Sequence, residues 1–142
     1  MTTTLYLAGP MTGIPQFNFP AFASAAHALR AVGFQVVSPH EQDDPAVAAA
    51  AWESPTGDPA DLPATGKGAD PLETAIENVK NVHECDGVAL LPDWQRSAGT
   101  RHEIETAHRF RLPVAPIGLW QCSGPFVDPY AFSIPAELDG AE

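Results

Sequence analysis

Apolar residues along the chain form short strand-like runs separated by stretches with helical periodicity. The run at residues 4–8 is apolar on both faces, and further strand-like runs follow at residues 34–37, 88–91 and 113–117. Such runs are typical of strands buried between two layers of helices. We therefore expect four strands at these positions, and a small edge strand at residues 132–134 as a fifth.

The stretches between these runs predict helices. Asn18 is a suitable N-cap for the first helix, and Gly33 suits the position after it. The apolar face of this helix consists of Phe22, Ala25, Ala26 and Leu29. A second helix has the clearest amphipathic spacing in the chain, at Leu72, Ala75, Ile76, Val79 and Val82. A third is predicted at residues 100–111, with Ile104, Ala107 and Phe110 on its buried side.

Strands that alternate with helices predict a parallel sheet with right-handed crossovers. The fold class is therefore α/β, a flavodoxin-like or Rossmann-like three-layer sandwich with four or five mostly parallel strands. Residues 38–70 differ in being rich in Pro, Asp, Ala and Gly. We expect a short helix near residues 46–52 in an otherwise long loop. This insertion is either a lid over a site or a surface segment, ordered in some cases only by a partner subunit.

Composition limits the classes of partner. With 142 residues the chain is expected to form one domain, residues 1–142. A net charge of −11 and only seven basic residues argue against binding to nucleic-acid polymers. No apolar run approaches the length of a membrane span, the opening residues are not those of a secretory signal, and Cys85 and Cys122 are isolated. We expect a cytoplasmic protein with no membrane association.

Two small-residue turns carry the candidate chemistry. Residues 6–10 and 97–103 each follow an apolar run, so they are expected at the carboxyl ends of the strands, where α/β folds bind ligands. Glu103 either forms a capping box with Thr100 or acts on an anomeric carbon, as carboxylates of glycoside-cleaving enzymes do. Ser97 and Gly99 either bind a phosphate at a helix N-terminus or form an ordinary turn.

Residues near these turns offer further contacts. Asp93 is placed to bind a base or a ribose hydroxyl, and Trp94 either stacks on a base or covers the core. Arg101 belongs to a cluster with Arg96, Arg109 and Arg111, which indicates either anion binding or ordinary helix-face charge. The histidines of the 100–111 helix are six residues apart, which excludes the two-histidine zinc motif, and no metal or cofactor is expected.

Taken together, the motifs resemble the nucleoside 2-deoxyribosyltransferase superfamily, most closely its short phage and bacterial proteins of unassigned function. The matching segments are YLAGPM at residues 6–11, NFPAF at residues 18–22, Cys85-Asp86, Leu91-Pro92-x-Trp94, Ser97, Gly99, Glu103 and Ala107. The match covers most of residues 4–37 and 72–117 and leaves out the central insertion and the C-terminal tail.

The resemblance implies an activity and a set of roles. Glu103 would attack C1′ of a nucleoside or stabilise the sugar cation, Tyr6 would orient Glu103, and Ser97 would bind a 5′-phosphate. The ligand would bind in the crevice formed by residues 6–11 and 93–103, and the expected substrate-binding residues are Gly9, Pro10, Met11, Asn18, Trp94, Ser97, Gly99 and Arg101. The expected function is hydrolysis of an N-glycosidic bond, or transfer of the (deoxy)ribosyl group, on a nucleoside or nucleoside 5′-monophosphate without a cofactor.

The chain departs from this superfamily at Asn78, where relatives have an aspartate that serves the leaving base. Asp93 is a candidate substitute with a catalytic role, and Asn78 itself favours the alternative of a non-catalytic module that binds or sequesters a nucleotide. A structural protein in which Glu103 only caps a helix is a third reading. Because relatives complete their sites across subunits, we also expect a homodimer or higher homo-oligomer. Aromatic residues that the predicted core does not use favour this interface: Trp52, Trp120, Phe126, Tyr130 and Phe132.

Overall fold

The centre of the molecule is a four-stranded sheet in which every strand is parallel to its neighbours. The computed structural model describes residues 3–63 and 71–123. In the order β2-β1-β3-β4, the strands are β2 (Gln35–Val37), β1 (Thr4–Ala8), β3 (Gly87–Leu90) and β4 (Val114–Pro116). The predicted α/β class and its four parallel strands are confirmed. The fifth strand predicted at residues 132–134 lies outside the described residues.

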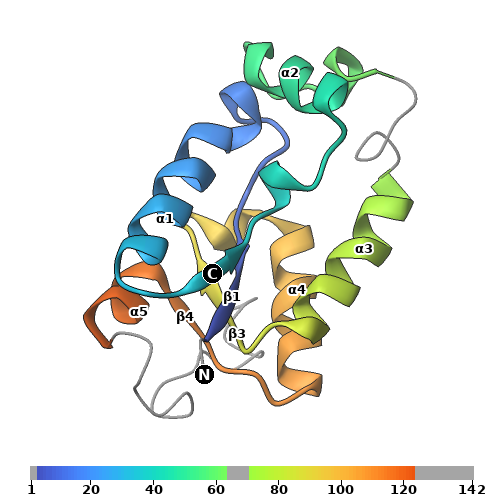
Figure 1. Ribbon diagram of the computed structural model, residues 1–142. Coiled ribbons are helices and arrows are strands. Elements are labelled where there is room, and N and C mark those ends of the chain that lie inside the picture. The colour runs from blue at the N-terminus through green and yellow to red at the C-terminus, as the bar shows by residue number, and fades with distance from the viewer. Residues whose placement is uncertain (1–2, 64–70, 124–142) are drawn as a thin grey trace.

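Two pairs of helices cover the two faces of this sheet (Figure 1). One face carries α1 (Phe19–Ala31) and α5 (Ile117–Ser123), and the other carries α3 (Pro71–Glu84) and α4 (Ala98–Arg109). Side chains of a strand alternate between the faces, so Leu5 and Leu7 pack toward α1 while Tyr6 and Ala8 pack toward α4. This alternation sends the Tyr6 phenol to the helix that carries Glu103.

The helix α5 was not predicted, and it contributes the largest buried side chain. Trp120 is 1% exposed, and its indole Nε1 donates a hydrogen bond of 3.0 Å to the carbonyl of Val88. Its ring packs edge-on against Phe34 at 5.8 Å. A Cβ added at Gly87 would lie 2.9 Å from the indole, so this strand position has room only for glycine. Trp120 therefore belongs to the core, and the expectation that it forms an interface is wrong.

The start of α1 differs from the predicted Asn18 cap. Gln16, Phe17 and Asn18 all have left-handed backbone conformations, with φ of 58°, 51° and 62°. An N-cap residue usually has an extended backbone, so Asn18 cannot place its side chain over the first helical N–H groups. Its Nδ2 instead donates a hydrogen bond of 2.9 Å to the carbonyl of Pro10. Asn18 thus ties the loop after β1 to the start of α1.

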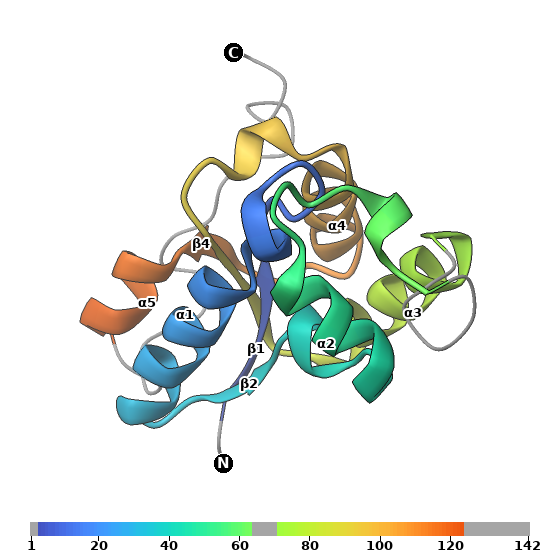
Figure 2. The same ribbon diagram turned by 90° about the horizontal axis from the view of Figure 1, so that it is seen from above.

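The short helix predicted near residues 46–52 is confirmed as α2 (Pro45–Glu53). The flanking residues, predicted as loop, also contain two short 3-10 helices, Pro39–Glu41 and Pro59–Asp61. Val47 and Ala51, four residues apart, are buried on one side of α2, and Ala51 packs with Phe17 and Phe19. This packing holds the segment over the carboxyl ends of the strands (Figure 2).

Two predicted core positions are exposed. Ile76 on α3 is 63% exposed, although the apolar spacing placed it on the buried side. Phe110 is 43% exposed and lies against the ring of His83 at 4.3 Å. Helical spacing identifies an apolar stripe that covers about 100° of the helix surface. The packing of α3 against α4 buries only part of this stripe. Val82, Ile104 and Ala107 are buried as predicted.

Candidate functional site

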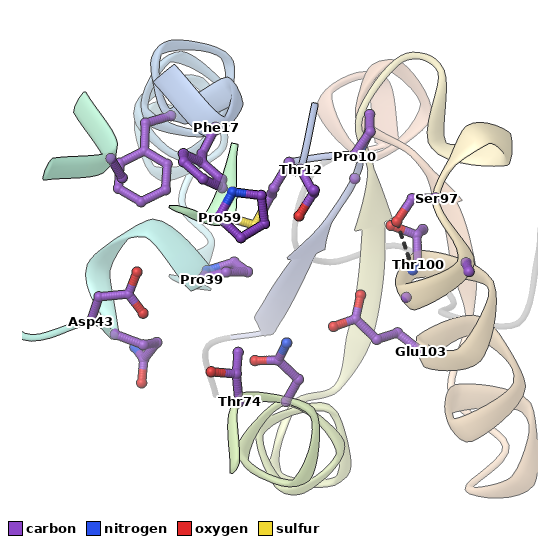
Figure 3. Close-up of a pocket in the computed structure, with 18 of the residues that line it drawn as sticks. Pro10, Thr12, Phe17, Pro39, Asp43, Pro59, Thr74, Ser97, Thr100 and Glu103 are labelled. Atoms are coloured by element: carbon purple, nitrogen blue, oxygen red, sulfur yellow. Dashed lines mark hydrogen bonds between the residues drawn. The ribbon is translucent and has the colours of Figure 1, made fainter. Parts of the chain in front are cut away.

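A cavity of about 850 Å³ opens at the carboxyl ends of β1 and β3. The chain leaves β1 toward β2 on one side and later continues to β3 on the other, so the strand order reverses between these two strands. Crevices at such a reversal are the usual ligand sites of open α/β sheets. The cavity walls come from the loop after β1, the segment around α2, and the starts of α3 and α4 (Figure 3).

Glu103 lies in one wall of this cavity with Tyr6 behind it. The carboxyl group belongs to the second turn of α4 and is 8% exposed, and Figure 3 shows it pointing into the cavity. The Tyr6 hydroxyl donates a buried hydrogen bond of 2.8 Å to Oε2 of Glu103. The Tyr6 side chain is 0% exposed, and its one polar atom, the hydroxyl oxygen, is used for the hydrogen bond to Glu103. The expected pairing of Tyr6 with Glu103 is present.

Burial gives Glu103 an unusual acidity. Loss of solvent raises its pKa from 4.5 to about 7, and the Tyr6 hydrogen bond opposes this rise in part. The pKa of Tyr6 is raised well above 10 by its own burial and by the neighbouring Glu103. The tyrosine therefore keeps its proton, while the glutamate changes charge near neutral pH. Groups that titrate near the working pH are typical of acid, base and nucleophile roles.

Ser97, rather than Thr100, caps α4. The Ser97 hydroxyl accepts a hydrogen bond of 3.1 Å from the backbone N–H of Thr100, and Ser97 has the extended backbone of an N-cap. The helix therefore begins at Ala98, directly after the Ser97 cap and two residues earlier than predicted. The predicted capping box is therefore wrong, and Glu103 lies too far along the helix to bond the cap residue.

The start of α4 forms a polar part of the cavity wall. Arg96, Ser97 and Gly99 line the cavity there, and Arg96 is the only described lining residue with a positive charge. The N–H groups of Ala98 and Gly99 have no partner within the helix, as in the first turn of any α-helix. A Cβ added at Gly99 would meet nothing closer than the Ser97 hydroxyl oxygen, at 3.8 Å. The absence of a side chain at residue 99 therefore leaves open space in the cavity.

The start of α3 contributes three polar side chains to the cavity: Thr74, Glu77 and Asn78. Their spacing of three and four residues puts them on one face of the helix. Of these three residues, Asn78 was considered from the sequence, and Thr74 and Glu77 were not. The signal was present, since the polar residues of this helix have the same periodicity as its apolar ones.

The opposite wall is mostly apolar. It comes from the loop after β1 and the segment around α2, with Pro10, Met11, Phe17, Phe19, Pro39, Ala51, Pro59 and Leu62 lining it. Asp43 also lies on this side, away from Glu103 (Figure 3). Gly9 allows the loop to approach β3, because a Cβ there would lie 2.7 Å from Cβ of Leu91. Of this wall, only Gly9, Pro10 and Met11 were expected from the sequence.

Several predicted site residues do not line this cavity. Asp93 is exposed and has a left-handed backbone, and with Trp94 it borders a smaller hollow beside Pro116 and Gly118. Trp94 is partly buried and packs on the core beneath α4, as the core-covering alternative predicted. Arg101 lies outside the lining, and Arg96 takes the position near Ser97. Asn18 acts one step away, through its hydrogen bond to Pro10.

Within residues 3–63 and 71–123, no group of three or more His, Cys, Asp or Glu side chains is placed to hold a metal ion. No helix in the same part of the chain is long and apolar enough to span a membrane.

Comparison with known proteins gives a family for the chain. A search of curated proteins found no match. One family model matches residues 3–116, which include all four strands and every described residue of the cavity wall. The family is described as a domain of unknown function, DUF4406. Because the match spans well over half of the sequence, the chain belongs to the DUF4406 family.

Proposed function

We propose that the protein cleaves the N-glycosidic bond of a nucleoside or nucleoside 5′-monophosphate, by hydrolysis or by transfer of the (deoxy)ribosyl group. The observation that carries the proposal is the buried Tyr6–Glu103 pair in the wall of a cavity at the sheet's reversal point. The resemblance to the nucleoside 2-deoxyribosyltransferase superfamily supports the same activity.

Glu103 acts on C1′ of the sugar in this proposal. Tyr6 holds Oε2, and Oε1 has no hydrogen-bond partner among the residues that the structure describes. The ionised carboxylate forms a bond to C1′, or stabilises the positive charge that develops there, as the base departs. A pKa of about 7 leaves an appreciable fraction of Glu103 ionised at neutral pH.

The start of α4 offers hydrogen-bond donors and positive charge that would bind a 5′-phosphate. The Ser97 hydroxyl accepts one hydrogen bond and still has its own proton to donate. The free N–H groups of Ala98 and Gly99 and the guanidinium of Arg96 add donors and positive charge to the same place. In a chain with a net charge of −11, this local arrangement favours a small anionic ligand over an extended one.

The test is release of free base from a panel of nucleosides and their 5′-monophosphates, followed by chromatography with and without an acceptor base. The proposal predicts turnover of at least one substrate, with monophosphates preferred. Release only when an acceptor base is present identifies a transferase, and release without one identifies a hydrolase. Absence of base release from the whole panel contradicts the proposal.

A second candidate function is a non-catalytic module that binds or sequesters a nucleotide. Asn78 favours it, because this amide lines the cavity where a proton donor for the base would be expected, and an amide has no acidic proton to give. Calorimetry separates the two functions. Binding of a monophosphate without any base release would support the module and exclude the enzyme.

A further inference from the structure

A second carboxylate lines the same cavity as Glu103. Glu77 lies on α3, on the helix face that it shares with Thr74 and Asn78. The helix α3 packs against α4, so this polar face borders the wall that holds Glu103. The Thr74 hydroxyl is buried and has no hydrogen-bond partner among the described residues, which marks the face as one whose polar groups are not all satisfied within the protein.

The leaving base creates a need for a proton. When the C1′–N bond breaks, its electron pair goes to the base nitrogen, and the base departs more easily if a proton arrives at the base as the bond breaks. Enzymes that cleave glycosidic bonds commonly divide the work between two carboxyl groups, one at the anomeric carbon and one at the leaving group. Glu103 accounts for the first of these two groups.

The other lining residues narrow the choice for the second. Asn78 has no acidic proton, and Arg96 keeps its proton at all relevant pH values. The pKa of Tyr6 is raised well above 10, and its hydroxyl is bonded to Glu103 beneath the cavity surface. Among the described lining residues, the remaining carboxyl groups are Glu77 and Asp43, and Asp43 lies across the cavity from Glu103 (Figure 3).

Building on the glycosidic function proposed above, we propose that Glu77 is the general acid for the departing base. Its carboxyl proton passes to the base as the C1′–N bond breaks and Glu103 takes up the charge at C1′. In hydrolysis, a water oxygen then bonds to C1′, any bond from C1′ to Glu103 breaks with its electron pair returning to the carboxylate, and a water proton goes to Glu77. In transfer, a nitrogen of the acceptor base bonds to C1′ in the same way, and its N–H proton goes to Glu77 instead. Asn78 hydrogen-bonds the edge of the base through its amide.

The test compares two kinds of leaving group in the full-length chain. One substrate is the nucleoside monophosphate that the enzyme cleaves best, and the other is the corresponding sugar phosphate with 4-nitrophenolate in place of the base. Nitrophenolate departs without protonation, so its release does not need a general acid. The variants are Glu77→Gln, Asp43→Asn and Glu103→Gln. Glu84→Gln is the matched control, because Glu84 is exposed on the same helix and does not line the cavity.

In the first turnover, Glu77→Gln is expected to slow base release by about 10²-fold or more while nitrophenolate release stays near the wild-type rate. Glu103→Gln should lose both activities, and Glu84→Gln neither. Thermal melting checks that each variant is folded.

Three outcomes overturn the inference. Wild-type base release in Glu77→Gln would show that Glu77 is not the acid. A selective loss in Asp43→Asn alone would assign the role to Asp43. Equal loss of first-turnover release from both substrates in Glu77→Gln would show a role in binding or folding rather than proton transfer to the base. If wild-type protein releases neither base nor nitrophenolate, the proposed function itself fails, and this result is distinguishable from the other three.

Discussion

At the scale of single residues, the chemistry of Glu103 depends on its burial and on Tyr6. The cavity wall removes most solvent from the carboxyl group, which favours its neutral form, while the Tyr6 hydroxyl donates to Oε2 and favours the charged form. Burial is the larger of the two effects, so the pKa is raised to about 7. The carboxyl group can therefore work near neutral pH in either form.

This raised pKa predicts a pH-dependent cost to stability. Between the unfolded-state pKa of 4.5 and the native value of about 7, the native protein holds more protons at Glu103 than the unfolded chain does. The stabilising contribution is complete below pH 4.5 and is lost as the pH rises through 7, by about 3 kcal/mol in total. Urea unfolding of wild type and Glu103→Gln from pH 4 to 8 measures it. The free energy of unfolding of wild type, relative to the variant, should fall over this range.

A constant difference between the two proteins across that range would contradict the native pKa of about 7. Other titrating groups are common to both proteins and cancel in the comparison.

Tyr6→Phe should shift the pH dependence of activity. The phenyl ring keeps the packing of β1 against α4 but removes the hydrogen bond that lowers the pKa of Glu103. The pKa of Glu103 should rise, so the acid limb of the kcat/KM profile should move to higher pH. Activity at pH 7 should fall and recover in part near pH 9. An acid limb at the wild-type position would show that the hydrogen bond does not control the ionisation of Glu103.

At the scale of elements, the first turn of α4 combines a structural cap with open space. Ser97 caps the helix, and Gly99 follows without a steric need for glycine, because a Cβ there would meet only the Ser97 hydroxyl oxygen at 3.8 Å. A glycine in a helix that nothing crowds lowers helix stability relative to alanine. The open space above Gly99 is consistent with close approach of a ligand to the backbone.

Gly99→Ala should therefore separate stability from binding. Alanine is favoured over glycine in a helix by up to about 1 kcal/mol, so the variant should be as stable as wild type or slightly more stable. The added methyl group should block the phosphate from the helix N-terminus and weaken monophosphate binding, measured by calorimetry. Ser97→Gly is the complementary variant. It removes the hydroxyl that would donate to the phosphate, while the free energy of unfolding falls by only a few tenths of a kcal/mol, because glycine is a tolerated cap residue. Unchanged affinity in Gly99→Ala would remove the phosphate from this turn.

Periodicity predicted the elements that repeat a simple pattern and failed where tertiary contacts decide. All four strands and the helices α1, α3 and α4 follow from the spacing of apolar residues. The helix α5 lies in a proline-rich stretch and is held by Trp120, whose indole bonds to a strand distant in sequence. The left-handed turn at residues 16–18 depends on contacts with the segment around α2, such as the Gln16 N–H donating to the carbonyl of Ser54 at 2.7 Å. Local sequence does not report such contacts.

The site followed the same division. The turns after strands singled out Gly9, Ser97 and Glu103, and all three line the cavity, because strand ends share one edge of a parallel sheet. Asp93 and Arg101 are close to these residues in sequence but lie outside the cavity wall. The direction in which a side chain points near a helix start depends on the residue at which the helix begins. The predicted start of α4 was two residues too late. The α2 segment was expected either as a lid over a site or as a surface segment, and which of its residues line the cavity depends on how it folds over the sheet.

At the scale of the whole molecule, the proposed homodimer rests on fewer residues than the sequence suggested. Trp120 is in the core, while Trp52 on α2 is 38% exposed. Phe126, Tyr130 and Phe132 lie outside the described residues. Trp52 packs edge-on against Phe19, which lines the cavity, so a partner covering this surface would lie next to the site. The superfamily resemblance implies sites completed across subunits.

Light scattering at micromolar concentration tests this assembly. A homodimer is expected, with twice the 15.0 kDa mass of one chain. Activity per chain should fall on dilution below the dissociation constant if the partner helps to close the cavity. A species of 15.0 kDa that keeps full activity would contradict the shared site, and the α2 segment would then close the cavity within one chain.

In the proposed function, Glu103 acts directly on the sugar of a bound nucleotide. Its most direct test is the initial rate of base release from a nucleoside 5′-monophosphate, measured for wild type and Glu103→Gln under identical conditions. Glutamine keeps the size of the side chain and can still accept the Tyr6 hydrogen bond, but it cannot form the bond to C1′ or carry the negative charge. We expect base release by wild type and a rate lower by about 10³-fold or more in a variant that melts cooperatively. Equal rates in the two proteins would contradict it.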